Sequence, residues 1–275
     1  MGERSSGGVA HAVTDGLARV ASAPAVLAGT LVVTLLFSLS PTVWGQFVVI
    51  DQYVAVLLLS PFGSVFYQSQ ASGAAWLVLW SFLAGGILDR YARNRPTRGR
   101  GFFGACGGHL PAMLRLGVAE WLVWLAASTV DRGSPRGYVP MIAGVAAGLV
   151  FLYARVRLVV EDRRSALGAL LASVRFIRRN PAAIPMFLIF AAAAWIVNWL
   201  WGLAPELRAG GLVPFATAEL LVTLLLFVVF ASWASAASLF QARLAHASYT
   251  AGPPLEWPES PAAEAITNLS ASAVP

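Results

Sequence analysis

The chain has 275 residues, of which 58% are hydrophobic and only 12% are charged, and its mean hydropathy is +0.70. Soluble domains carry about 25% charged residues, so this composition excludes an ordinary soluble domain and indicates an integral membrane protein. The formal net charge is +6. We expect no nucleic-acid binding, because the basic residues flank apolar segments, where they set orientation and contact anionic lipid.

The first expected element is a cytoplasmic amphipathic helix in residues 1–22. Apolar residues recur there at helical spacing through Val13, Leu17 and Val20. The alternative is that this region and the apolar segment after it form a cleavable signal peptide. No Ala-x-Ala site follows Leu39, so we expect the apolar segment to be retained as a helix.

Six apolar segments are long enough, at about 1.5 Å rise per residue, to cross most of a ~30 Å hydrocarbon core. They cover residues 23–40, 72–89, 111–129, 138–159, 183–203 and 213–240. A seventh stretch, 47–62, is interrupted by Asp51 and Gln52, so we interpret it as interfacial or re-entrant, with a full crossing as the alternative. The predicted fold class is therefore all-α, a polytopic membrane helical bundle of about six transmembrane helices plus interfacial amphipathic helices, with residues 23–249 as the membrane domain.

All 19 basic residues are arginines, and they are divided unequally between the two sides of this bundle. With the N-terminus inside, 15 of them fall in cytoplasmic regions, 3 in outer loops and one, Arg115, within the third span. Basic residues collect on the cytoplasmic side of membrane proteins. Abundant Gly, Ala and Arg without lysine is typical of high-GC bacterial coding. We therefore predict a multi-pass protein of the bacterial inner membrane with both termini in the cytoplasm. The C-terminal residues 250–275 are expected to form a disordered cytoplasmic tail.

The first basic connector, between the second and third spans, is rich in glycine. It contains Gly101, Gly104, Gly107 and Gly108 together with Cys106, the one cysteine of the chain. We expect a mobile loop here, with the thiol reduced because the loop is cytoplasmic. Without lysine the glycines cannot form a Walker-type phosphate loop.

The second basic connector contains an expected amphipathic helix that ends at Asn180-Pro181 and is capped by Asp162 or Ser165. Its apolar face is predicted from Leu167, Leu170, Leu171, Val174 and Ile177. The expected surface for anionic lipid or a partner protein consists of Arg163, Arg164, Arg175, Arg178 and Arg179, with most of these arginines on the other face. Such a helix either lies in the headgroup plane or packs on the cytoplasmic end of the bundle.

Polar residues within or beside the spans form a candidate intramembrane site: Glu120, Glu219, Asn198 and Arg115. Glu120 lies near the middle of the third span, where a carboxylate costs a few kcal/mol unless it is paired or protonated. Arg115 is about 140° away around the same helix, at 3.6 residues per turn. A partner for Glu120 must therefore come from another helix. We favour a structural carboxyl over a proton- or substrate-linked site.

Small residues predict two helix-packing faces. Gly144 and Gly148 form a Gly-xxx-Gly pair in the fourth span, and Ser232 and Ser235 lie in a small-residue region of the sixth. The partner is either another span or a second copy of the chain, and we favour packing within the chain.

Three inner helix ends share a short pattern: Tyr91-Ala92-Arg93, Tyr153-Ala154-Arg155 and Gln241-Ala242-Arg243. Repeated hairpins are common in transporter folds, where substrates bind between the repeats. Tyrosine and arginine are also favoured at any inner boundary, and we favour that simpler explanation.

The sequence has no recognised catalytic or metal-binding pattern. It lacks Gly-x-Ser-x-Gly and His-Glu-x-x-His, and Cys106 with His109 supplies two ligands where a metal site needs three or four. We expect no enzyme activity, no cofactor and no metal. The predicted function is a non-enzymatic accessory or scaffold protein with an arginine-rich cytoplasmic face. The alternative is a small transporter or permease component that uses Glu120.

The stretch from Tyr153 to Val174 reads Tyr-Ala-Arg-Val-Arg-Leu-Val-Val-Glu-Asp-Arg-Arg-Ser-Ala-Leu-Gly-Ala-Leu-Leu-Ala-Ser-Val. It resembles a pattern in a loose group of bacterial six-span membrane proteins, in which a span runs into Val-Val-Glu and then into an amphipathic helix. That group includes the membrane domain attached to some glycerophosphodiester phosphodiesterases. The resemblance implies the fold and a membrane role. It does not imply phosphodiesterase activity, because these residues contain no such catalytic domain.

Overall fold

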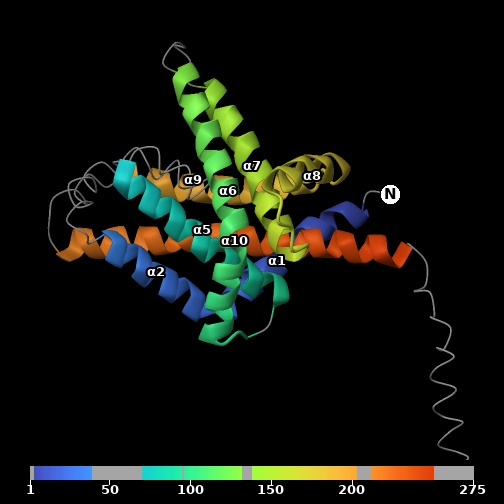
Figure 1. Cartoon of the computed structure of the whole chain (residues 1–275), viewed down its shortest axis with the longest axis horizontal. Coiled ribbons are helices and arrows are strands. Elements are labelled where there is room, and N and C mark those ends of the chain that lie inside the picture. Colours follow the sequence, from blue (N-terminus) through green and yellow to red (C-terminus); the bar gives the residue numbers. More distant parts are fainter. Residues whose placement is uncertain (1–2, 39–69, 95, 132–137, 203–211, 251–275) are drawn as a thin grey trace, which may run out of the picture. The chain divides into compact units, whose positions relative to one another are not determined.

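The computed structural model of the chain describes residues 3–38, 70–94, 96–131, 138–202 and 212–250. Every regular element in these ranges is an α-helix, which confirms the predicted all-α class. In chain order (Figure 1) the helices are α1 (Glu3–Ala21), α2 (Pro24–Ser38), α5 (Gln70–Arg93), α6 (Gly99–Asp131), α7 (Tyr138–Val160), α8 (Ala166–Arg179), α9 (Ala183–Gly202) and α10 (Leu212–Thr250). The stretch 47–62 and the tail after Thr250 lie outside the described residues.

Each apolar segment expected to span the membrane forms a helix: α2, α5, α6, α7, α9 and α10. Among the described residues, Glu219–Leu244 is the helix that is long and apolar enough to cross a membrane alone. Two bent pairs reach that length only when each is counted as one span: Gly8–Ala21 with Pro24–Thr34, bent by 70°, and Ala166–Arg179 with Ala183–Val197, bent by 103°. This criterion gives one to three crossings, and the six-span bundle stays a prediction.

The chain divides inside α10. Residues 1–241 form one compact unit and residues 242–275 form the other. Within the first unit α5 packs on α6, α6 on α7 and α7 on α8, while α1 contacts α2, α5 and α9. Phe230, Trp233 and Phe240 of α10 are buried in the core of this unit.

The glycine-rich first connector is helical, and the prediction of a mobile loop there is wrong. α6 begins at Gly99 and continues without a break through Pro111. Its early turns lie so close to α5 that a Cβ added at Gly86 would collide with Sγ of Cys106. Packing on α5 therefore outweighs the low helix propensity of glycine and proline.

This packing makes a prediction for Cys106, which is fully buried. Burial raises the pKa of its thiol to about 11, and the thiolate is the reactive form. We expect a maleimide to label Cys106 very slowly in the native protein near neutral pH, faster as the pH approaches that value, and fully after unfolding in detergent. Mass spectrometry of the labelled chain measures the extent of reaction.

A Gly107→Cys variant in a Cys106→Ala background is the matched control, because a Cβ at Gly107 meets no atom within 4 Å. It should react quickly in the native state. Equal labelling rates at Cys106 and at the control cysteine would contradict the contact between α5 and α6.

Candidate functional site

The most deeply buried charges among the described residues form an ion pair between α6 and α7. The guanidinium of Arg155 donates a hydrogen bond to the carboxylate of Glu120, and their side chains are 2% and 0% exposed. Cζ of Arg155 also lies 5.9 Å from the ring centroid of Trp233 on α10, a cation–π contact. The prediction that the partner of Glu120 belongs to another helix is confirmed.

Aromatic rings surround this pair on the side of α10. The ring of Trp233 lies 6.5 Å from that of Trp80 on α5 and 6.0 Å from that of Phe230. Removing two charges from water costs several kcal/mol for each, so each ion depends on the other for compensation. The pair therefore joins α6 to α7 in an apolar interior, as expected for a structural carboxyl.

The other residues predicted near Glu120 have different surroundings. Arg115 is exposed, and its Nη1 donates to the backbone carbonyl of Arg164 at 3.3 Å. Glu219 is half-buried on α10. Asn198 lies on α9, with its side chain outside the described set. Arg155, which was predicted only as an orienting charge at the inner end of a span, is the residue that sequence reasoning missed.

The small residues of α10 pack within the chain, and their partner is the amphipathic helix α1. A Cβ added at Gly16 would lie 2.6 Å from the backbone nitrogen of Ser235, so the two helix backbones come very close. Ser232 is half-buried beside this contact, and Gly144 and Gly148 are buried on α7. Packing within the chain is confirmed at Ser235, although the partner is not one of the expected spans.

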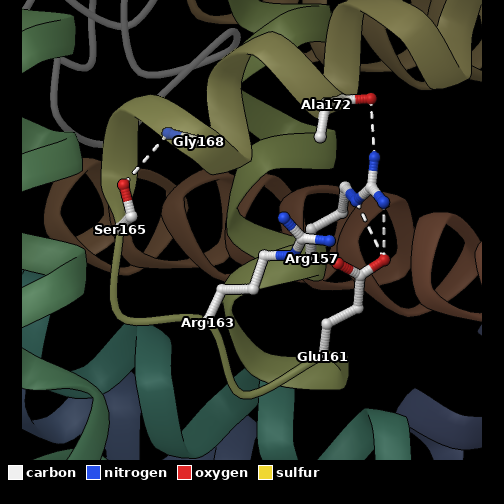
Figure 2. A network of polar contacts seen from close by, with 6 residues as sticks. All are labelled: Arg157, Glu161, Arg163, Ser165, Gly168 and Ala172. Atoms are coloured by element: carbon white, nitrogen blue, oxygen red, sulfur yellow. Dashed lines mark hydrogen bonds and ion pairs between the residues drawn. The ribbon is translucent and has the colours of Figure 1, made fainter.

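The sharp corner between α7 and α8 is held by Arg157 (Figure 2). Its guanidinium donates to one carboxylate oxygen of Glu161 at 2.6 and 3.0 Å and to the carbonyl oxygen of Ala172 on α8 at 2.6 Å. Glu161 also accepts a hydrogen bond from Arg163. Glu161 is thus shared by two arginines, and the corner keeps one positive charge in excess. The sequence signal for this network was the spacing of four residues between Arg157 and Glu161.

Of the two predicted caps of α8, Ser165 is the one used. The N–H of Gly168 donates to Oγ of Ser165 at 3.2 Å. Asp162 instead ends α7: its φ is +48°, and the N–H of the next residue, Arg163, returns to the carbonyl of Leu158 at 3.1 Å. This left-handed closing turn ends α7, and the chain can then begin α8 in a new direction.

α8 presents a buried side and an exposed side. The buried side consists of Ala166, Ala169, Ser173 and Phe176. The exposed side includes Leu167, Leu171 and Val174, which are 72%, 65% and 41% exposed. Arg175, Arg178 and Arg179 are exposed as well. The prediction that leucines and arginines occupy opposite faces is wrong, because Val174 and Arg178 lie one turn apart on the same side.

The exposed side of α8 is apolar and positively charged at once. Among the described residues Arg175, Arg178 and Arg179 form no ion pair, and α8 contains no acidic residue. Of the two predicted arrangements, packing on the bundle is observed: small residues and Phe176 fasten the helix, while leucines and arginines face away. Placement in the headgroup plane stays a prediction. Exposed leucines flanked by arginines are typical of helices in the membrane interface.

Comparisons with known protein families, with curated proteins and with solved structures gave no match. The function is therefore argued from geometry. In the described ranges no three His, Cys, Asp or Glu side chains are grouped as metal ligands. The exposed side of α8 offers two kinds of chemistry, insertion of apolar side chains and forked hydrogen bonding of guanidinium to phosphate or carboxylate.

Replacing Glu120 by Gln should destabilise the protein by about 3–5 kcal/mol, because Arg155 then stays buried without its carboxylate. Denaturant unfolding of the purified protein in mild detergent measures the loss. The double variant Glu120→Gln with Arg155→Met should recover much of it, since no unpaired charge remains buried.

Glu219→Gln is the matched control, the same change at a half-buried position. We expect it to alter the free energy of unfolding much less. A Glu120→Gln variant as stable as the parent protein would show that the ion pair does not hold α6 and α7 together.

Proposed function

We propose that the protein is a non-enzymatic accessory or scaffold protein of the bacterial inner membrane that binds anionic lipid headgroups through α8. The observation that carries the proposal is the exposed side of α8, where Leu167 and Leu171 lie beside Arg175 and Arg178, which form no ion pair with any residue that the structure describes. A membrane-protein partner or a second copy of the chain is the alternative occupant of this surface.

Large apolar side chains on the outside of α9 support insertion into a bilayer. Those between 42% and 61% exposed are Ile184, Leu188, Ile189, Trp195, Ile196, Trp199 and Leu200. Soluble monomers rarely expose so much contiguous apolar surface, whereas lipid tails solvate it without cost. The same unit buries the charges of Glu120 and Arg155 in its interior, away from these exposed apolar side chains.

Contacts between helix ends support six spans with both termini in the cytoplasm. Nη1 of Arg19 donates to the carbonyl oxygen of Tyr91 at 2.8 Å and to Oε1 of Gln241 at 3.0 Å. Arg115 reaches the carbonyl of Arg164 in the same way. The distribution of arginines assigns all of these positions to one side of the membrane, and these contacts agree with that assignment.

The geometry of α8 suits a charged lipid surface. Apolar side chains of such a helix enter the headgroup region by roughly 5–10 Å, while its arginines meet phosphate groups. Arg157 and the cap at Ser165 fix the helix in place, so little order has to be gained on binding. Arg163 differs from these arginines in that it forms an ion pair, with Glu161.

The alternative function, a small transporter or permease component, would need Glu120 to exchange a proton or a substrate. The bond from Arg155 and the complete burial of the carboxylate support a structural role instead. Proton-driven flux into vesicles that is abolished by Glu120→Gln without loss of folding would favour the transporter.

Replacing Arg175 and Arg178 together by Gln should weaken binding of phosphatidylglycerol by about 2 kcal/mol, roughly 30-fold, at ~1 kcal/mol per arginine. The purified chain is titrated with lipid in neutral detergent at low salt, and native mass spectrometry measures the bound lipid. Phosphatidylcholine should bind both proteins equally.

The matched control is Arg98→Gln with Arg100→Gln, which removes two exposed arginines from the other basic region. It should retain most of the affinity for phosphatidylglycerol. An equal loss of affinity in both double variants would show that net charge alone explains the binding and would contradict a binding surface on α8.

The topology predicts which side of the membrane each cysteine label reaches. In a Cys106→Ala background, cysteines introduced at Arg100 and Leu167 should react with an impermeant maleimide only after the cells are permeabilised. A cysteine at Arg132 should react in intact spheroplasts. Labelling of the first two positions from outside would overturn the orientation.

A further inference from the structure

A second basic site lies where α1 meets the end of α5, and it uses none of the arginines of α8. Arg90 on α5 is only 6% exposed. Its Nη2 donates to the carbonyl oxygen of Ser22 at the long distance of 3.5 Å. Its Nη1 is buried, and among the described residues it has no hydrogen-bond partner. A buried guanidinium in this condition lacks the compensation that such charges require.

The nearby carboxylates are already engaged by other arginines. Asp15 pairs with Arg19 at 2.8 Å, and Asp89 pairs with Arg93 at 2.7 Å. In the described part of the chain Arg90 has no ion pair. Three guanidinium groups therefore face two carboxylates at this junction, and the one in excess is the most buried of the three.

Arg19 supplies a further donor at the junction of α1 and α5. Its Nη1 is committed to the carbonyl of Tyr91 and to Gln241, but its Nε is buried without a partner among the described residues. Burial raises the pKa of Asp15, but a hydrogen bond from Ser238 and the charge of Arg19 outweigh it and lower that pKa. Asp15 therefore stays ionised beside Arg19.

The position of Arg90 limits the anion that reaches it. Ser22, which accepts its one bond, is exposed, and the side chain of Arg93 is 52% exposed. The guanidinium therefore lies just beneath the surface, at helix ends that the proposed topology places at the level of the inner headgroups. Phosphate is the most abundant anion at that level, and guanidinium binds it through forked hydrogen bonds.

We propose that Arg90, with the Nε of Arg19 as a second donor, binds one phosphate group at the junction of α1 and α5. The phosphate belongs either to the headgroup of an anionic phospholipid or to a free phosphate ion. This site differs from the surface on α8 in being buried and specific, so it holds one phosphate per chain and resists salt. Exposed arginines lose most of their attraction for anions in high salt, because the Debye length falls to about 3 Å at 1 M.

The experiment uses the full chain in neutral detergent at high salt, where binding to α8 is screened. Inorganic phosphate and short-chain phosphatidylglycerol are titrated separately, and the midpoint of thermal unfolding is measured. At least one of them should raise the midpoint of the parent protein. In Arg90→Gln, the ligand concentration needed for the same rise in midpoint should be about tenfold higher or more, as expected when a hydrogen-bonded charge is lost.

Arg93→Gln is the matched control, the same change three residues away at an exposed and already paired arginine. Its unfolding midpoint should rise with the ligand as in the parent protein. The same is expected of Arg175→Gln with Arg178→Gln, a double variant that tests the α8 surface separately. A response to phosphate alone identifies the free ion, and a response to phosphatidylglycerol alone identifies the lipid. No response to either, an equal response in Arg90→Gln, or equal stabilisation by acetate would overturn the proposal.

The unliganded Arg90→Gln protein gives a second readout. Because Arg90 is buried and pairs with no carboxylate among the described residues, removing its charge should leave the unliganded midpoint unchanged or raise it. If Arg90→Gln fails to fold, Arg90→Lys takes its place, since it keeps the charge but not the forked geometry. Undiminished binding in Arg90→Lys would overturn the assigned geometry.

Discussion

A charge placed in an apolar interior restricts a helical bundle more strongly than any single apolar contact does. Leucine and alanine side chains on neighbouring helices pack acceptably in several relative positions, but Glu120 and Arg155 compensate each other in one. Turning either helix by one residue, about 100°, would leave two unpaired charges in a water-poor environment. The pair thus sets the alignment of α6 against α7, and Trp233 extends that alignment to α10.

The C-terminal end of α7 carries two arginines that bind partners on different sides of the helix. Arg155 and Arg157 are two residues apart, which is about 200° around a helix, so they point to opposite sides. One holds the core through Glu120, and the other holds α8 through Glu161 and Ala172. A single helix end therefore connects the interior of the bundle to the helix on its surface.

Sequence reasoning predicted the helices well because their signals are local. Apolar length placed α2, α5, α7 and α9 near their observed bounds and the start of α10 at the right place, whereas α10 continues to Thr250, beyond the predicted end at residue 240. The start of α6 was missed because glycine and proline usually break helices, and only its contact with Gly86 of α5 explains why they do not. Arg155 was missed because arginines at a helix end look alike in sequence. Which one turns inward depends on a carboxylate on another helix.

Sequence reasoning also failed to predict which side of α8 is buried. Its leucines and arginines gave a strong periodic signal, but the residues that face the bundle are mostly small. Ala166, Ala169 and Ser173 contribute little to any hydropathy pattern, although they decide how closely the helix approaches α7. A sequence pattern thus predicts that α8 is amphipathic and leaves open which side is covered.

The contact of α1 with α10 has a consequence for how the protein is made. Gly16 and Arg19 meet Ser235 and Gln241, and the bond between Arg19 and Gln241 joins residues 222 positions apart. A ribosome delivers the first helix long before the last one exists. The buried side of α1 must therefore wait through most of translation, shielded by the membrane surface or a chaperone. α1 therefore reaches its final place only after α10 has been made, and a truncation that removes Ser235 and Gln241 would disturb α1.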